Sequence, residues 1–167
     1  ARKRTTTYGR IGKTFVESSP GFVQKDPQWS GRTPHEAPPA EGILALYNRG
    51  DKRRWYWPCP KCSSYFEGRF EMLTYERRAD QTNLEISETV RMKCPHCSHS
   101  IHPDERDAMQ QRGRWVKDGQ GVGKDGVVFG PKPRTSIASF WLRGVAAVFT
   151  NWKKLLELYL NADDEFE

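Results

Sequence analysis

Hydrophobic and polar residues alternate over only short stretches in the first two thirds of this chain, a pattern typical of brief β-strands separated by turns. Trp55-Tyr56-Trp57 and Thr89–Met92 are predicted strands, and Phe15-Val16 is a shorter one. Residues 22–42 hold several prolines, so we predict a loop there. Residues 76–89 are polar, and we expect them to form a hairpin loop.

The last third of the chain predicts two helices. Pro103–Glu105 favours a helix start, because proline suits the first helical position and acids suit the positive end of the helix, and Gly113 is a favourable C-cap. A second helix is predicted to begin after Thr150 or Asn151. Its apolar stripe is made by Trp152, Leu155, Leu156, Tyr159 and Leu160.

Two segments of opposite character lie between these predicted helices. Residues 118–133 are rich in glycine and lysine, and we expect them to be mobile. Residues 137–149 form the most hydrophobic run of the chain, which we expect to contain a strand.

The four cysteines form two copies of a C-P-x-C motif, at Cys59–Cys62 and at Cys94–Cys97. Two residues between the thiols let both sulfurs of a motif reach one ion, and two motifs supply four thiolates in a closed tetrahedron. We therefore predict a structural Zn²⁺ site with the ligands Cys59, Cys62, Cys94 and Cys97. An iron site of the rubredoxin type uses the same ligands, and a pair of disulfides is the remaining alternative.

The order of strand, C-P-x-C turn, strand, long excursion, strand and second C-P-x-C turn is typical of a zinc ribbon. We expect an α+β fold in which a four-cysteine zinc ribbon is inserted between short strands and two helices. Its predicted parts are residues 1–50, with a strand and a proline-rich loop, residues 51–102, the zinc ribbon, and residues 103–167, with a helix, a glycine-rich loop, a hydrophobic strand and a C-terminal helix.

Charge adds a candidate partner to this picture. The formal net charge is +6 and the isoelectric point is about 9.2. Cations and aromatic rings are interleaved over residues 52–57, and further cations lie near the cysteine motifs. Because cations contact phosphates and rings stack on bases, we predict a DNA-contacting set. Its members are Lys52, Arg53, Arg54, Trp55, Lys61, Arg91 and Lys93. The alternative is that the rings pack the ribbon and the cations form a solvated face.

The sequence shows no catalytic constellation, because it has no plausible Ser/His/Asp set and no cysteine outside the two motifs. Residues 9–14 do not make a phosphate-binding loop, since Thr7 stands where that motif needs glycine and Pro20 follows too soon for a helix. No apolar run approaches the roughly 20 residues of a membrane-spanning helix. We therefore expect no membrane partner and a cytoplasmic protein.

Several segments, taken in order, resemble the large subunit of lambda-type (GpA family) phage terminases, the motor that packages viral DNA. The matching segments are Phe15–Pro20, Arg32–Pro34 through Gly42–Leu44, Tyr47–Asp51 with Arg54–Tyr56, the two C-P-x-C motifs, Arg112–Trp115 and Ala138–Leu142. The cysteine motifs alone are common to many zinc ribbons, but the ordered set is much more specific.

The resemblance implies a role for Ser18, Ser19 and Pro20. In that family a strand ending in such a turn looks like the coupling motif, which follows the Walker B strand and links nucleotide hydrolysis to movement. Residues 1–50 would then be the end of an ATPase domain, and the fold a remnant of an α/β ATPase domain. The sequence has neither a Walker A nor a Walker B motif, and the family's nuclease domain would follow Glu167. We expect a middle fragment that alone neither hydrolyses ATP nor cuts DNA.

The resemblance also implies partners in the host cell: double-stranded DNA, the terminase small subunit and the portal. Apolar residues 141–149 would face a neighbouring surface of the intact motor, so we expect them to be exposed here and to promote self-association. The alternative function is a structural zinc ribbon or protein-docking module without direct DNA contact.

Overall fold

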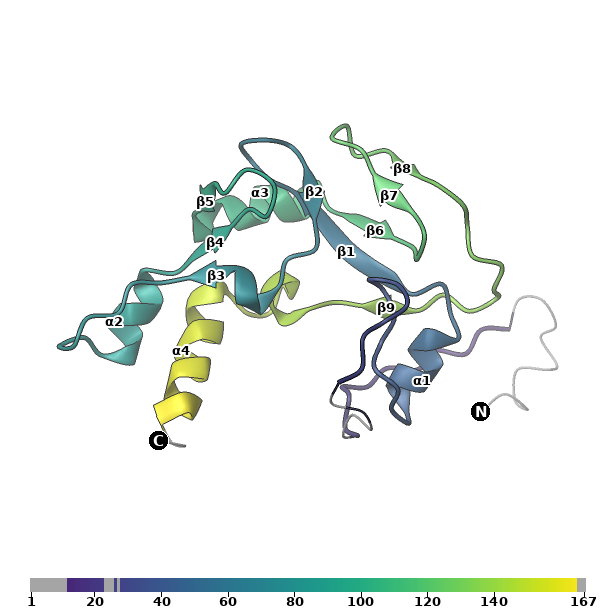
Figure 1. The fold of residues 1–167 in the computed structure, drawn as a ribbon, viewed down its shortest axis with the longest axis horizontal. Coiled ribbons are helices and arrows are strands. Elements are labelled where there is room, and N and C mark those ends of the chain that lie inside the picture. The colour runs from purple at the N-terminus through teal and green to yellow at the C-terminus, as the bar shows by residue number, and fades with distance from the viewer. Residues whose placement is uncertain (1–11, 23–25, 27, 165–167) are drawn as a thin grey trace.

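In the computed structural model, which describes residues 12–22, 26 and 28–164, the strand β1 (Arg53–Pro58) is the centre of the larger sheet. Its partners are β2 (Tyr65–Phe66) and β6 (Arg114–Val116), both antiparallel, and β9 (Phe140–Trp141), which is parallel. A second sheet has the order β3 (Leu73–Thr74), β4 (Arg91–Lys93), β5 (Ser100–Ile101). A separate hairpin consists of β7 (Gly121–Val122) and β8 (Val128–Phe129) (Figure 1).

The helices of the described residues are short except for the last one. They are α1 (Ile43–Asn48), α2 (Asn83–Glu88), α3 (Arg106–Gln111) and α4 (Trp152–Asp164). Three single 3₁₀ turns accompany them, η2 (Phe70–Met72), η3 (Pro103–Glu105) and η4 (Gly144–Ala146).

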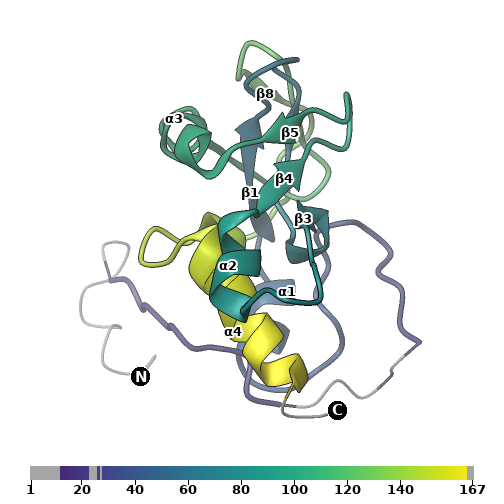
Figure 2. The ribbon, with the colours of Figure 1, turned by 90° about the vertical axis from the view of Figure 1, so that its left-hand side faces the viewer.

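The main hydrophobic core lies between α4 and the two sheets. Trp152, Leu156 and Leu160 recur every four positions, so they share one face of α4, and all three are buried. The ring of Trp152 meets the ring of Trp57 in β1 at a centroid distance of 6.2 Å, and its indole N–H donates to the carbonyl of Val145. Helix α2 packs beside α4 (Figure 2), so that strands and helices far apart in the sequence bury one common core.

Capping residues explain where two of the helices begin. The side-chain oxygen of Asn151 accepts a hydrogen bond of 2.8 Å from the Lys154 amide, and α4 starts where the sequence predicted. Thr82 and Glu85 form a reciprocal capping box at the start of α2. The expectation of a hairpin loop over residues 76–89 is therefore wrong in its second half, because this capping box nucleates a helix there.

Three further expectations can be compared with the structure in the second half of the chain. The helix after Pro103 is confirmed as η3 followed by α3, and the Gly113 amide donates to the Gln110 carbonyl just after it. Residues 118–133 contain the β7–β8 hairpin, where we expected an irregular mobile loop. The hydrophobic run of residues 137–149 contains only the two-residue strand β9 and the turn η4.

The described residues among the first fifty contain less regular structure than expected. Phe15 and Val16 are exposed and lie in no strand of the described part of the chain. The basic residues before position 12 and the acids after position 164 lie outside the described residues. The mixed helix-and-sheet class is confirmed, whereas the descent from an ATPase domain and the division into residues 1–50, 51–102 and 103–167 stay predictions.

His35 connects the loop before α1 to β1 through two hydrogen bonds. Its Nδ1 lies 2.9 Å from the carbonyl oxygen of Lys52, and its Nε2 lies 3.0 Å from the Tyr56 hydroxyl. Because a carbonyl only accepts, Nδ1 carries the proton, and Nε2 of the neutral ring accepts from the tyrosine. Burial lowers the pKa of His35, outweighing the hydrogen bond to Lys52 and the charges of Asp118 and Glu67, which raise it.

We expect His35 to make stability depend on pH below its ordinary pKa of 6.5. As the pH falls through this value, the unfolded chain takes up a proton that the folded chain does not, so the free energy of unfolding falls. The variant His35→Gln lacks this titrating group. Urea unfolding of both metal-loaded proteins at about pH 7.5 and about pH 6 should show that the wild type exceeds the variant in free energy of unfolding by less at the lower pH. An advantage that grows at the lower pH would mean that the folded chain holds a charged His35.

Candidate metal centre

The four cysteines lie at the tips of two β-hairpins. Cys59 and Cys62 lie in the turn between β1 and β2, whose register pairs Trp57 with Phe66. Cys94 and Cys97 lie in the turn between β4 and β5. Each turn is therefore held by strands of a different sheet, and the cysteine cluster joins the two sheets.

The two turns have the same local conformation. In each, the amide of the residue after the second cysteine donates to the carbonyl of the first cysteine, from Ser63 to Cys59 (2.9 Å) and from Ser98 to Cys94 (3.0 Å). Both serines are in the left-handed region, with φ of 59° at Ser63 and 57° at Ser98. This reversal of the chain places the two sulfurs of each turn on the same side.

The sulfur positions fit a tetrahedral metal site. All four Sγ atoms lie within 4.8 Å of one another, with 3.7 Å between Cys59 and Cys97 and 3.9 Å between Cys62 and Cys94. Metal–sulfur bonds of about 2.3 Å in a tetrahedron separate the sulfurs by about 3.8 Å, whereas a disulfide bond is about 2.05 Å long. All four are free thiols at separations longer than a disulfide bond, so the cluster is positioned to hold one metal ion.

The surroundings of the thiols differ between the two positions of each turn. Cys59 and Cys94 are buried, and burial raises the pKa of Cys94 and raises that of Cys59 to about 12. Cys62 is half-buried, and hydrogen bonds from the amide and hydroxyl of Ser64 lower its pKa to about 6. Two buried thiols that resist ionisation need a cation to become ligands, so metal binding would release protons here.

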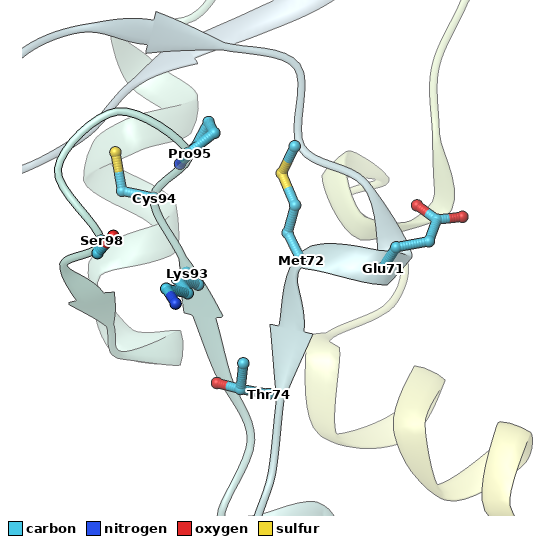
Figure 3. A pocket seen from close by; sticks show the side chains of 7 residues that line it. All are labelled: Glu71, Met72, Thr74, Lys93, Cys94, Pro95 and Ser98. Carbon is cyan, nitrogen blue, oxygen red and sulfur yellow. The ribbon is translucent and has the colours of Figure 1, made fainter.

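A small hollow of about 240 Å³ opens beside the second cysteine turn. It is lined by Glu71, Met72, Thr74, Lys93, Cys94, Pro95 and Ser98. Figure 3 shows Met72 and Pro95 on opposite sides of the hollow. Its volume is below the roughly 300–1,000 Å³ of typical small-molecule sites, so this hollow does not indicate a small substrate.

The basic run before the first cysteine turn is tied into ion pairs of the chain. The ammonium group of Lys52 lies 2.6 Å from Asp118, and Arg53 bonds to Asp51. Arg54 is only 2% exposed and pairs with Glu67 at 3.3 Å. These side chains stabilise the fold as it stands, and their predicted DNA contact stays a prediction.

The remaining members of the predicted DNA-contacting set lie in three different settings. The indole N–H of Trp55 donates to the side-chain oxygen of Gln110 in α3, at 2.6 Å. Lys61 and Lys93 are exposed, the first inside one cysteine turn and the second directly before the other. Arg91 is half-buried and donates to the carbonyls of its neighbours in the chain.

The sequence analysis missed an acidic residue that organises this region. Glu67 is buried and forms ion pairs with Arg54, Arg69 and Arg143. Arg69 is a neighbour in the sequence, but Arg54 and Arg143 are distant and reach Glu67 only through the fold. The residues predicted for the coupling motif, Ser18–Pro20, are exposed, and the Ser18 hydroxyl bonds to the carbonyl of Ser19.

Comparison with known proteins identifies a family. The family described as phage terminase large subunit gpA, ATPase domain, matches residues 1–115, which is more than half of the chain. No curated protein and no solved structure matches the chain. None of the helices in the described residues combines the length and apolar character that crossing a bilayer requires.

The left-handed residue of the second turn provides a test of the metal geometry. A β-branched side chain disfavours this conformation, so Ser98→Val should strain the turn by about 1–2 kcal/mol and weaken zinc binding about tenfold. Ser98→Gly should bind at least as tightly as the wild type. Ser100→Val is the matched control, because Ser100 lies in β5, where β-branched residues are favoured. Competition for zinc with a chromophoric chelator measures the affinities, and unchanged binding by Ser98→Val would contradict the assigned turn.

Proposed function

Because the chain belongs to the phage terminase large subunit gpA family, we propose that it is the zinc-binding portion of a viral DNA-packaging motor. Cys59, Cys62, Cys94 and Cys97 hold Zn²⁺ in this proposal, and the ion fixes a surface that contacts duplex DNA. The observation that carries it is the four-sulfur cluster, with sulfur separations of 3.7 and 3.9 Å, in a chain of this family.

Zinc is the proposed ion because the site has a structural role. The ion has no redox chemistry and no geometric preference of its own, so it suits four thiolates that join two hairpins. Four thiolates leave no coordination position open for water or substrate, so the role of the ligands is to hold the two turns together. We propose no catalytic step for these residues, since neither Walker motif is present in the sequence.

The proposed duplex contact rests on the exposed cations of the cysteine turns. Lys61 and Lys93 belong to the two turns that the sulfur cluster brings together, and Arg91 lies two residues before Lys93 on β4. Ammonium groups bind backbone phosphates without reading the bases, as a packaging motor for DNA of any sequence requires. Lys52, Arg53, Arg54 and Trp55 form a second set, because each already has a partner within the chain.

The N-terminal segment is proposed to couple nucleotide chemistry to movement. Ser18 and Ser19 offer short hydroxyl groups, and Pro20 directly follows them in the chain. These side chains are exposed, so they are free to line a nucleotide site contributed by another part of the motor. The terminase small subunit and the portal are further proposed partners.

A second candidate function is a protein-docking module without DNA contact. Leu142, Val148 and Phe149 expose apolar surface, and Phe149 is 89% exposed. Val145, which we expected in the same surface, is buried, and Trp141 is half-buried. Apolar surface of this kind is typical of interaction sites and would also support self-association.

A charge reversal at the cysteine turns distinguishes the two candidates. We expect zinc-loaded wild type to bind a labelled duplex, with an affinity that falls steeply between about 50 and 200 mM salt. Lys61→Glu/Lys93→Glu should weaken duplex binding at least about tenfold. It should also reduce the slope of log affinity against log salt concentration by the amount expected for about two phosphate contacts. Fluorescence anisotropy measures both quantities.

The control variant is Lys153→Glu/Lys154→Glu, which makes the same charge change at exposed positions of α4. It should bind duplex within about twofold of the wild type if the contact is local. If the wild type carries one zinc per chain and binds no duplex, the direct contact is refuted and the docking module is the better account.

A further inference from the structure

A second surface with the chemistry of a nucleic-acid site lies at the other end of β1 from the cysteines. On one face of the larger sheet, the ring of Trp115 lies between the rings of Trp55 and Phe140, at centroid distances of 5.1 and 5.0 Å. The strand register explains this: Trp55 is opposite Trp115 on β6, and Arg53 is opposite Phe140 on β9. We call these three rings, together with the guanidinium of Arg53, the aromatic face.

The Arg53 guanidinium, the cation of the aromatic face, is ion-paired with Asp51. The guanidinium of Arg53 lies 4.6 Å from the centre of the Phe140 ring. Two of its nitrogens donate to one carboxylate oxygen of Asp51, at 2.9 and 2.8 Å, and Lys117 reaches the same oxygen at 3.4 Å. The other oxygen of Asp51 accepts from the Ser139 amide. The carboxylate of Asp51 thus has partners for both of its oxygens within the chain. Arg53 and Lys117 together carry two positive charges beside this one negative charge.

The aromatic face is open on one side only. At its Trp55 end α3 covers it, since Gln110 binds the indole and Gly113 lies too close for even a methyl group. At its other end Phe140 is 51% exposed. The opposite face of the sheet is closed, because the Arg54 guanidinium packs 4.0 Å from the ring of Trp141. The fold therefore leaves Phe140 accessible on β9, which pairs with the start of β1 (Figure 1 shows the two strands).

Positive charge is concentrated next to this surface. The segment that leads from β6 through the β7–β8 hairpin, residues 112–134, carries many cations and few acids. Its cations are Arg112, Arg114, Lys117, Lys124, Lys132 and Arg134, and its acids are Asp118 and Asp125. Asp118 is already paired with Lys52, and Asp125 caps the turn of the hairpin. The segment that contains Trp115 thus carries a surplus of cations, which is complementary to a polyanion.

We propose that the aromatic face binds single-stranded DNA, with an unpaired base stacked on the exposed ring of Phe140, which Trp115 supports edge-on, and the flanking phosphates bound by Lys117 and the exposed cations of residues 112–134. Exposed rings interleaved with cations are the elements of single-strand binding surfaces. In a duplex both faces of every base are already stacked, so the rings add nothing to duplex affinity. This surface is separate from the cysteine turns and extends the proposed function to DNA with unpaired bases.

The test compares a ring deletion on the aromatic face with one elsewhere. Phe140→Leu keeps an apolar side chain but removes the stacking ring, and Phe149→Leu removes an exposed ring that pairs with no other aromatic ring among the described residues. Each zinc-loaded chain is titrated with a labelled oligothymidylate and with a labelled duplex. We expect Phe140→Leu to lose about tenfold in affinity for oligothymidylate and less than about twofold for duplex. Phe149→Leu should match the wild type with both ligands.

Two further measurements separate this proposal from the duplex contact. Binding of oligothymidylate should quench tryptophan emission, and Trp115→Phe should remove most of that quenching even if its affinity changes little. Lys61→Glu/Lys93→Glu should retain oligothymidylate binding within about twofold. The proposal is overturned if the wild type binds duplex but no oligothymidylate, which would leave the aromatic face to a protein partner. It is also overturned if Phe140→Leu and Phe149→Leu bind oligothymidylate equally well.

Discussion

The convergence of four sulfurs from two hairpins is the constraint on which the rest of this structure depends. The buried thiols of Cys59 and Cys94 lie at the edge of the main core, in contact with the cluster that contains Trp57 and Trp152. Burial keeps these thiols protonated unless a cation is present, so the metal, the ionised ligands and the packed core stabilise one another. The β1–β2 and β4–β5 hairpins meet at this point, so a bound ion would link the two sheets there.

The charges of the chain serve two separate purposes. Part of the positive charge is internal: Arg54 and Glu67 form a buried pair, and removing Glu67 would cost about 3–5 kcal/mol because the buried guanidinium of Arg54 would be left uncompensated. The remaining charge is exposed, at the cysteine turns and along residues 112–134. A count of cations in the sequence therefore overstates the basic surface at residues 52–54 and understates it at the β7–β8 hairpin.

Local signals in the sequence predicted the parts of the structure that depend on neighbouring residues. The spacing of the cysteines predicted the metal cluster, and Asn151 with the apolar stripe after it predicted α4. The capping box of Thr82 and Glu85 was an equally local signal, but the polar composition of residues 76–89 hid it. The burial of Arg54 could not be predicted, because it depends on α1, Glu67 and Trp141 meeting at one strand. The aromatic face likewise arises from a parallel pairing between β1 and β9, across more than eighty residues, that no periodicity indicates.

The most direct test of the metal-centred account is the metal content of the purified chain, followed by its removal. Native mass spectrometry should find one zinc ion per chain, and the cobalt-substituted protein should show the strong visible absorption of tetrahedral thiolate coordination. Chelation should then abolish the near-ultraviolet circular dichroism of the packed tryptophans, because Trp57 lies directly between the first cysteine turn and α4. A chain that holds no metal and keeps the same dichroism after chelation would contradict the account.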